Sequence, residues 1–278
     1  MTEGVELIVH FDAPPVVEVV AGVAFEGMGP EAGALMAAFW KERLREQFPL
    51  VEEQPPYAPP IEQFGTAVQS SNFTFQLGTG FPGARLLAST ADRQELIQLQ
   101  PGWFACNWRK VQATDEYDHW PKRRAAFDKW FNELSDFLTS ADAKPPKITQ
   151  CEVTYVNHIY PGPVWSQHAH FERIFVSSFG KLGKGRLEQI TAQAQFTIGD
   201  ENQPSGRLHV KILPAYAKDG LTPLYVLELT ARGIASSGRA PTDFLGLGRA
   251  AIDSLFLEIT TSEMQAEWKR VRDDGNRN

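Results

Sequence analysis

The feature that most constrains the fold is a match between two segments of the same chain. RAAFDKWFNEL at 124–134 aligns with RAAIDSLFLEI at 249–259, and six of the eleven positions are identical. A second match aligns VEVV at 17–20 with CEVT at 151–154. Because one match lies near the start of each half and the other near its end, the sequence predicts an internal duplication.

The same order of secondary structure is predicted around both matches. In the first half, apolar periodicity and β-branched composition predict a strand at 16–25, a helix at 31–48, strands at 72–78, 84–90 and 96–110, and a helix at 116–138. In the second half they predict a strand at 148–160, a helix at 169–179, strands at 187–199, 206–217 and 223–233, and a helix at 242–259. A proline-rich connector, QPPYAPPIEQ at 54–63, is expected to be extended. We therefore expect two repeats of one βαβββα unit, at 1–145 and 146–278, the second followed by a short C-terminal helix.

This element order also predicts the fold class. A strand followed by a helix, a meander and a second helix gives an antiparallel sheet with its helices packed on one face. The predicted class is therefore α+β, and the order resembles the repeat of TATA-box-binding-protein-like and helix-grip folds. Two such sheets that join edge to edge remove an exposed edge, and the face without helices is left for another contact. The sequence leaves open whether the two repeats share one continuous sheet.

The two ends of the chain resemble a known family. PPVVEVVAGVAFEG at 14–27 and FLEITTSEMQAEW at 256–268 look like the opening and closing segments of a sporadically distributed bacterial family of about this length, which has no established activity. The resemblance implies a shared fold, a cytoplasmic location and a link to mobile or defence genes. It transfers no catalytic residue to this chain.

Charge limits the partners that this chain can be expected to bind. Residues 1–145 contain 12 Lys/Arg against 20 Asp/Glu, and residues 146–278 contain 15 against 14. Neither half has the basic excess that drives binding to a phosphate backbone. Nucleic acid is therefore an unfavoured partner.

Cysteine usage and hydropathy favour a cytoplasmic protein. The chain has two cysteines, Cys106 and Cys151, and both lie in apolar runs typical of reduced core thiols. No run approaches the ~20 apolar residues of a membrane helix. The first residues, MTEGVELIVHFDAPP, lack the pattern of a signal peptide. We expect a soluble cytoplasmic protein without a membrane partner.

Glu18 is a carboxylate inside a strand of valines, and the internal match places it opposite Glu152. Strand alternation puts Glu18 on the same face as Val16 and Val20. A structural ion pair is the favoured interpretation, with Arg109, Arg232, Arg124 or Arg249 as candidate partners, because buried charges are usually paired. The alternative is a ligand-facing acid on the open face of the sheet. The ligand-facing candidates are Glu18, Trp103, Trp108, Arg109, Glu152 and Arg232. The tryptophans are included because an aromatic side chain beside Arg109 can stack on a base or a sugar. Packing under the helices is nevertheless the favoured interpretation for the tryptophans.

No pattern in the sequence predicts a metal or a cofactor. The HAH segment at 168–170, with His158 nearby, has no acidic or Cys partner at ligand spacing and is interpreted as a surface loop. GTGFPG at 78–83 lacks the Lys and Ser/Thr of a phosphate-binding loop, and GLGRAA at 246–251 lies inside a predicted helix rather than after a strand. No catalytic residue is assigned.

Three classes of function remain. The favoured one is a binding module for a protein or small-molecule partner. A nucleic-acid binder with a curved sheet and an enzyme of unrecognised type are the alternatives. The oligomeric state is left open.

Overall fold

The computed structural model describes residues 10–26, 28–29, 31–64, 84–177, 185, 187–200, 202–234 and 239–271. The strands are β1 (His10–Phe11), β2 (Val16–Glu26), β3 (Leu50–Gln54), β4 (Arg85–Ser89), β5 (Glu95–Gln100), β6 (Trp103–Arg109), β7 (Lys147–Ile159), β8 (Ala192–Gly199), β9 (Pro204–Tyr216), β10 (Pro223–Gly233) and β11 (Arg270–Val271). The helices are α1 (Ala32–Phe39), α2 (His119–Ser140), α3 (Phe171–Ile174), α4 (Phe244–Ile259) and α5 (Ser262–Glu267).

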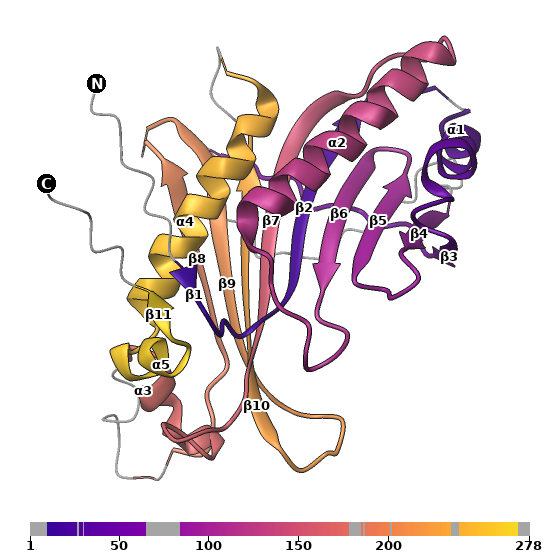
Figure 1. The fold of residues 1–278 in the computed structure, drawn as a ribbon. Helices are drawn as coiled ribbons and strands as arrows, with labels where there is room; N and C mark the ends of the chain where they lie inside the picture. Colours follow the sequence, from indigo (N-terminus) through magenta and orange to yellow (C-terminus); the bar gives the residue numbers. More distant parts are fainter. Residues whose placement is uncertain are drawn as a thin grey trace, which may run out of the picture.

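One antiparallel sheet of nine strands forms the centre of the molecule (Figure 1), in the order β3-β4-β5-β6-β2-β7-β10-β9-β8. The first long strands of the two halves, β2 and β7, pair with each other in the middle. β6 lies on the far side of β2, and β10 lies on the far side of β7. The two halves therefore share one continuous sheet, and each meander extends outward from the central pair.

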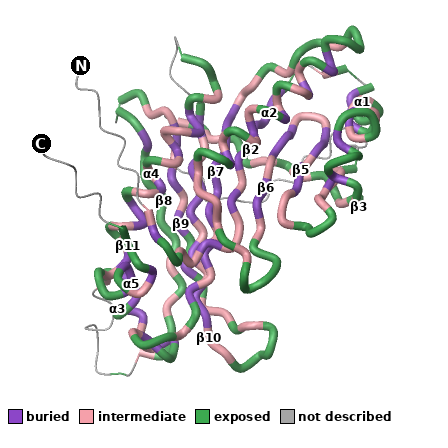
Figure 2. Tube along the Cα trace, in the orientation of Figure 1, coloured by how far each residue is buried: buried purple, intermediate pink, exposed green. Residues whose placement is uncertain are grey.

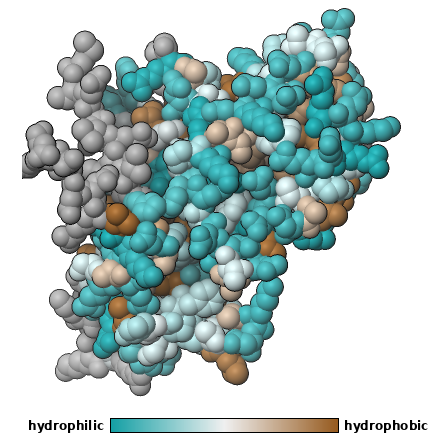
Figure 3. Space-filling model, viewed as in Figure 1, coloured by the Kyte–Doolittle hydropathy of each residue, from teal (hydrophilic) through white to brown (hydrophobic). Residues whose placement is uncertain are grey.

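The helices lie on one face of this sheet, which we call the helix face, as expected for the α+β class. Helix α2 packs on β6 and β2, and α4 packs on β10 and β7 (Figure 1). Alternate residues of β2, Val19, Ala21 and Val23, join the buried core beneath the helices. Burial is deepest along the central strands (Figure 2), and the outer surface on this side is mostly hydrophilic (Figure 3). The core is thus one layer between sheet and helices.

A bulge in β2 changes the expected orientation of its first residues. The pairing of β2 with β7 shifts register between Val16 and Glu18. Val16 belongs to the core on the helix face, whereas Val20 packs against a small apolar cluster on the opposite face. The expectation that Val16 and Glu18 share a face is wrong, because a bulge inserts one residue into the alternation.

Other elements differ in extent from those predicted. The helix expected at 31–48 is α1 followed by a π-helical stretch, Trp40–Leu44. The helix expected at 169–179 ends at Ile174, because Phe175 forms a β-bridge with Thr260. β3 was not predicted; it is a short strand with mostly exposed residues that gains its order by pairing with β4. The strand expected at 72–78 lies outside the described residues.

The sheet face opposite the helices carries an extended segment, residues 55–64, which we call the strap. It follows β3 and runs behind the strands in the view of Figure 1. The strap contacts residues of β5, β7 and β9. The side of the sheet that it crosses is called the strap face below.

Candidate functional site: the sheet face beneath the strap

The strap face contains most of the candidates chosen from the sequence, namely Glu18, Trp103, Arg109, Glu152 and Arg232. Trp108 instead lies on the helix face, buried with its ring 5.3 Å from that of Tyr117. Trp103 and Trp108 are separated by an odd number of positions on β6, so strand alternation points them to opposite faces. The structure does not bring these two tryptophans together.

Both matched carboxylates are held by arginines from the neighbouring strands. Glu152 Oε2 accepts a hydrogen bond from Arg232 Nε at 2.5 Å, and its side chain is 8% exposed. Glu18 Oε1 accepts from Arg109 Nε at 2.9 Å, and its side chain is 27% exposed. The ion pair expected for Glu18 is therefore present, and its partner is Arg109. Both carboxylates are therefore engaged in ion pairs on the strap face.

Glu18 also ends a ladder of polar side chains that crosses the first half of the strap face. Arg85 Nη1 donates to Gln98 Oε1 at 3.1 Å, and Gln98 Nε2 donates to Asn107 Oδ1 at 2.9 Å. Asn107 Nδ2 then donates to Glu18 Oε1 at 2.6 Å. The ladder connects β4, β5, β6 and β2, and these partnered groups fix the register of the strands.

Two buried glutamines hold the backbone of the strap. Gln100 accepts from the Tyr57 amide at 2.8 Å and donates to the Tyr57 carbonyl at 2.5 Å. Gln150 accepts from the Glu62 amide at 2.8 Å and donates to the Pro60 carbonyl at 2.7 Å. Each side-chain amide uses a donor and an acceptor on main-chain groups. These contacts hold the main chain of the strap and do not involve its side chains.

Tyr57 is the aromatic anchor of the strap. Its ring meets the Trp103 ring edge-on, with centroids 5.3 Å apart, above Ala24 and Ala105. Trp103 lies across Gly22, where an added Cβ would be 2.8 Å from the indole ring. A side chain at position 22 would therefore displace the Trp103 indole and weaken its contact with the Tyr57 ring.

The Tyr57 hydroxyl lies beside the Glu152–Arg232 pair. Burial raises the pKa of Tyr57 to about 12, and the Glu152 carboxylate adds to the increase, against the opposing effects of Arg232 and Arg85. The Arg85 guanidinium also lies over the Tyr57 ring, 5.6 Å from its centroid. The phenol is therefore neutral at physiological pH and contributes a hydrogen bond and an apolar ring.

Glu62 is the acidic anchor of the strap. Its carboxylate accepts from Arg207 Nη1 at 2.8 Å and from His209 Nε2 at 2.6 Å, and its side chain is 8% exposed. Burial alone would raise the pKa of Glu62, but the hydrogen bonds from His209 and Arg207 outweigh it and hold that pKa below its ordinary value. Arg207 also donates to the Gln63 carbonyl at 2.8 Å and lies 4.5 Å from the centroid of the Phe64 ring.

The strap supplies a charge that this part of the sheet requires. Arg207 and Arg232 lie directly opposite each other on β9 and β10. Like charges in this position repel, which destabilises the pair of strands. Glu152 neutralises Arg232 from within the sheet, whereas Glu62 of the strap neutralises Arg207. Without the strap, Arg207 and His209 form a basic site.

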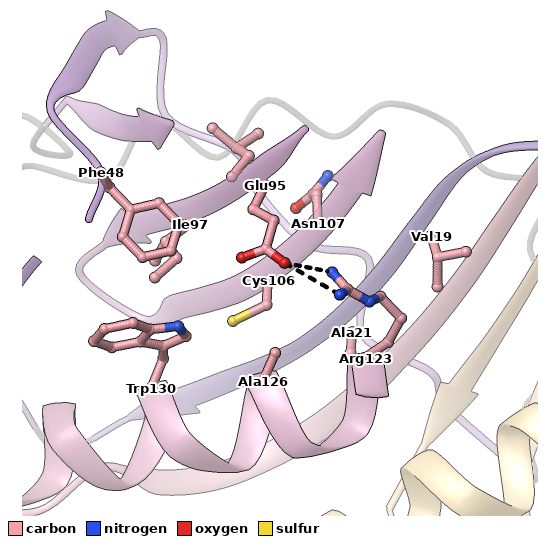
Figure 4. A pocket seen from close by; sticks show the side chains of 11 residues that line it. Val19, Ala21, Phe48, Glu95, Ile97, Cys106, Asn107, Arg123, Ala126 and Trp130 are labelled. Carbon is pink, nitrogen blue, oxygen red and sulfur yellow. Dashed lines mark hydrogen bonds and ion pairs between the residues drawn. The ribbon is translucent and has the colours of Figure 1, made fainter. Parts of the chain in front are cut away.

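A pocket on the helix face lies between α2 and the strands β2, β5 and β6 (Figure 4). Its volume is about 10 Å³, which leaves room for about one water molecule. Arg123 lines this pocket, and its guanidinium donates from Nη1 to Glu95 Oε1 at 3.1 Å and from Nη2 to Asp118 Oδ2 at 2.6 Å. Burial raises the pKa of the adjacent Cys106 thiol, which favours its protonated form. This pocket belongs to the structural core.

A second pocket, of about 50 Å³, opens between the start of α2 and the middle of α4. The hydroxyls of Tyr117 and Tyr155 are 2.7 Å apart within it, and burial raises the pKa of both phenols. Arg249 pairs with Asp253 and lies over the Tyr155 ring. His119 has a positive φ of 64° and, mainly through burial, a lowered pKa. Tyr117 and His119 precede the periodic part of α2, so no pattern in the sequence identified them.

The described residues contain no group of three His, Cys, Asp or Glu side chains arranged to bind a metal. His168, expected in a solvated loop, is buried; its Nε2 is 3.1 Å from the Leu224 carbonyl, and it lies among Trp165, Tyr216 and Tyr225. Cys106 and Cys151 are free thiols. None of the described helices combines the length and apolar character needed to cross a membrane.

The chain matches no model of a known protein family, and no curated protein matches it.

Proposed function

We propose that this protein is a binding module that engages a polypeptide partner through its strap face. The observation that carries the proposal is the pair of clamps formed by Gln100 and Gln150, which hold an extended backbone across the sheet. A basic site, Arg207 with His209, lies at one end of the same track. Main-chain recognition combined with a charged side-chain site is typical of peptide-binding surfaces.

We also propose that the sheet arose by duplication of one βαβββα unit, with repeats at 1–145 and 146–278. Three correspondences support this. β2 and β7 meet at the centre, each flanked by the last strand of its own meander. Glu18–Arg109 corresponds to Glu152–Arg232. Helices α2 and α4 carry matching pairs four residues apart, Arg124–Asp128 and Arg249–Asp253. The resulting order is the one compared above with TATA-box-binding-protein-like folds.

Charge on the strap face disfavours the nucleic-acid alternative. The basic side chains Arg109, Arg232 and Lys211 each form an ion pair with a glutamate of a neighbouring strand. A phosphate backbone is bound by uncompensated basic groups. The resemblance of the chain ends adds the proposal of a cytoplasmic bacterial protein linked to mobile or defence genes.

The second pocket supports a second candidate, a small-molecule site. It gathers two neutral phenols, a neutral imidazole and an Arg–Asp pair above an apolar floor that includes Leu229 and Phe256. Convergent polar groups with perturbed pKa values in a cavity are typical of ligand sites. A ligand there would be small and uncharged, because Asp253 already neutralises Arg249.

Affinity capture of cross-linked partners with three variants of the full-length protein tests the polypeptide proposal. Arg207→Ala and Gln150→Ala remove one side-chain site and one backbone clamp. Lys211→Ala is the matched control, since Lys211 is on the same strand and face but pairs only with Glu228 in the described contacts. We expect a partner that cross-links to the strap face, is retained by the control and is lost from the other two. A partner that cross-links only to α2 or α4 would refute the assignment.

A further inference from the structure

We infer that the strap is an internal stand-in for the partner, and that the partner carries the same pattern: an aromatic residue, two prolines at the second and third positions after it, and an acidic residue at the fifth. In the strap these positions are Tyr57, Pro59, Pro60 and Glu62. The inference rests on the proposed function and specifies which polypeptide the strap face selects.

The distance between the two anchor sites sets this spacing. The strap crosses the strands, since its clamps are on β5 and β7 and its acidic site is on β9. Trp103, under Tyr57, is on β6, which is four strand spacings of ~4.8 Å, or about 19 Å, from β9. Five residues of polyproline conformation span about 15 Å. The side chains of Glu62, Arg207 and His209 cover the remainder, so a shorter segment cannot reach both anchors.

The residues between Tyr57 and Glu62 suit an extended path across the strap face, each for its own reason. Proline has no amide hydrogen, so Pro59 and Pro60 present no donor that the sheet must satisfy, while the Pro60 carbonyl still accepts from Gln150. Their fixed φ angles also keep the segment extended before it binds. Ala58 and Ile61 point outward, and Ile61 is 53% exposed. The strap face therefore fixes the chain at Tyr57, Pro60 and Glu62 but leaves positions 58 and 61 open.

The contacts that hold the strap would allow another polypeptide segment to displace it. None of its residues belongs to the main hydrophobic core between the sheet and the helices. It is held by polar and surface contacts: the two glutamine clamps, the Tyr57–Trp103 contact, the Glu62 ion pairs, the Arg207 contacts with Gln63 and Phe64, and Arg85 over Tyr57. Removing it exposes the basic groups Arg207 and His209, which another acidic residue would satisfy. A displaced strap can therefore leave the core packing unchanged.

Covalent attachment gives the strap an advantage over any free peptide. A tethered segment has an effective concentration in the millimolar range, against which a free peptide must compete. The unmodified protein should therefore bind a free strap peptide weakly. Weakening the internal strap at both anchors should reveal the intrinsic affinity of the strap face.

The test uses the full-length Tyr57→Ala/Glu62→Ala double variant and a fluorescein-labelled peptide, QPPYAPPIEQF, in an anisotropy titration. We expect the peptide to bind the variant at least tenfold more tightly than the unmodified protein. In the peptide, Tyr→Ala or Glu→Ala at the anchor positions should each weaken binding at least tenfold. Ile→Ala at the solvent-facing position is the matched control and should leave affinity unchanged.

The outcomes separate this inference from the proposed function. If the anchor-substituted peptides and an unrelated acidic peptide bind as well as the strap peptide, the strap face binds polypeptides without this selectivity, and only the inference is overturned. If no peptide binds the folded double variant, the inference and the proposed function both fail.

Hydrogen exchange in the unmodified protein provides a second measurement that does not depend on the folding of the double variant. The amides of Tyr57 and Glu62 donate to Gln100 and Gln150. Excess strap peptide should accelerate exchange at both amides at least twofold by displacing the strap, whereas the peptide with alanine at both anchors should not. Equal acceleration by the two peptides would overturn the inference.

Discussion

Glu18 and Glu152, the two carboxylates matched in the sequence, differ in burial. Both accept from an arginine on the adjacent strand, but the side chain of Glu152 is 8% exposed and that of Glu18 is 27% exposed. The strap lies over the Glu152 pair, with the Tyr57 hydroxyl beside it. Burial of an ion pair makes each partner dependent on the other, because the remaining charge is left without water.

Glu152→Ala should therefore destabilise the protein more than Glu18→Ala. Breaking a buried pair costs ~3–5 kcal/mol, whereas a partly exposed pair contributes about 1 kcal/mol or less. Urea denaturation would measure the two free energies of unfolding. Lys147→Ala, which breaks an exposed pair with Glu26, is the control and should leave the midpoint unchanged. Equal losses for the two glutamate variants would contradict this account.

Glu62 should make the attachment of the strap sensitive to acid. The groups that face its carboxylate are His209, Arg207 and Arg232, and the pKa of Glu62 lies below its ordinary value of 4.5. Because the folded-state pKa is depressed, the stabilisation is fully present above pH 4.5 and is lost as the pH falls through the folded-state value. The difference in unfolding free energy between the unmodified protein and Glu62→Gln should therefore shrink as the pH falls below 4.5. A difference that does not shrink at all as the pH is lowered from 4.5 would argue against this linkage.

At the scale of elements, the strap depends on its prolines for stiffness. Replacing a proline in a compatible conformation costs about 0.4–1 kcal/mol, chiefly because the free chain gains conformations. Pro59→Ala/Pro60→Ala should therefore accelerate amide exchange at Tyr57 and Glu62 several-fold. The melting temperature should change little, since the strap contributes nothing to the main core. Pro55→Ala, on the exposed stretch before the clamps, is the control. Unchanged exchange in the double variant would show that the clamps alone keep the strap in place.

The elements that the sequence predicts well are those with a local pattern. The apolar face of α2, with Phe127, Leu134 and Leu138, and the β-branched run of β2 follow helical and strand periods that tertiary contacts reinforce. Arg109 is one of four arginines that the sequence offers as partners of Glu18, and the pairing of β2 with β6 in the sheet selects it. Strand alternation separates Trp103 from Trp108, although the sequence offers both as candidates for the same face.

The strap could not be placed from the sequence. Its residues have no periodicity, and Glu62 meets Arg207 and His209 across 145 and 147 positions of the chain. Nothing in a proline-rich connector indicates which face of a sheet it crosses. The pocket near Tyr117 was missed for a similar reason, since it joins a loop, a strand and a helix from distant parts of the chain.

At the scale of the whole molecule, the pairing of β2 with β7 should make unfolding a single event. The central pair runs from Val16 to Glu26 on β2, and it joins the two halves through backbone hydrogen bonds and a shared core. Calorimetry should show one transition, even though 278 residues exceed the size of most small two-state domains. Leu229→Ala, in β10, should accelerate exchange in β6 as much as in β9. Two resolved transitions would mean that the halves unfold independently.

The strap crosses the boundary between the two halves of the sheet, where β2 pairs with β7. One end is fixed over β5 and β6 through Gln100 and Trp103, and the other is fixed over β9 through Arg207 and His209. A stiff segment that is attached on both sides of a twisted sheet limits how far those two sides can move apart. The strap thus connects the two halves of the sheet a second time, on the face opposite the helices, in addition to the backbone pairing of β2 with β7.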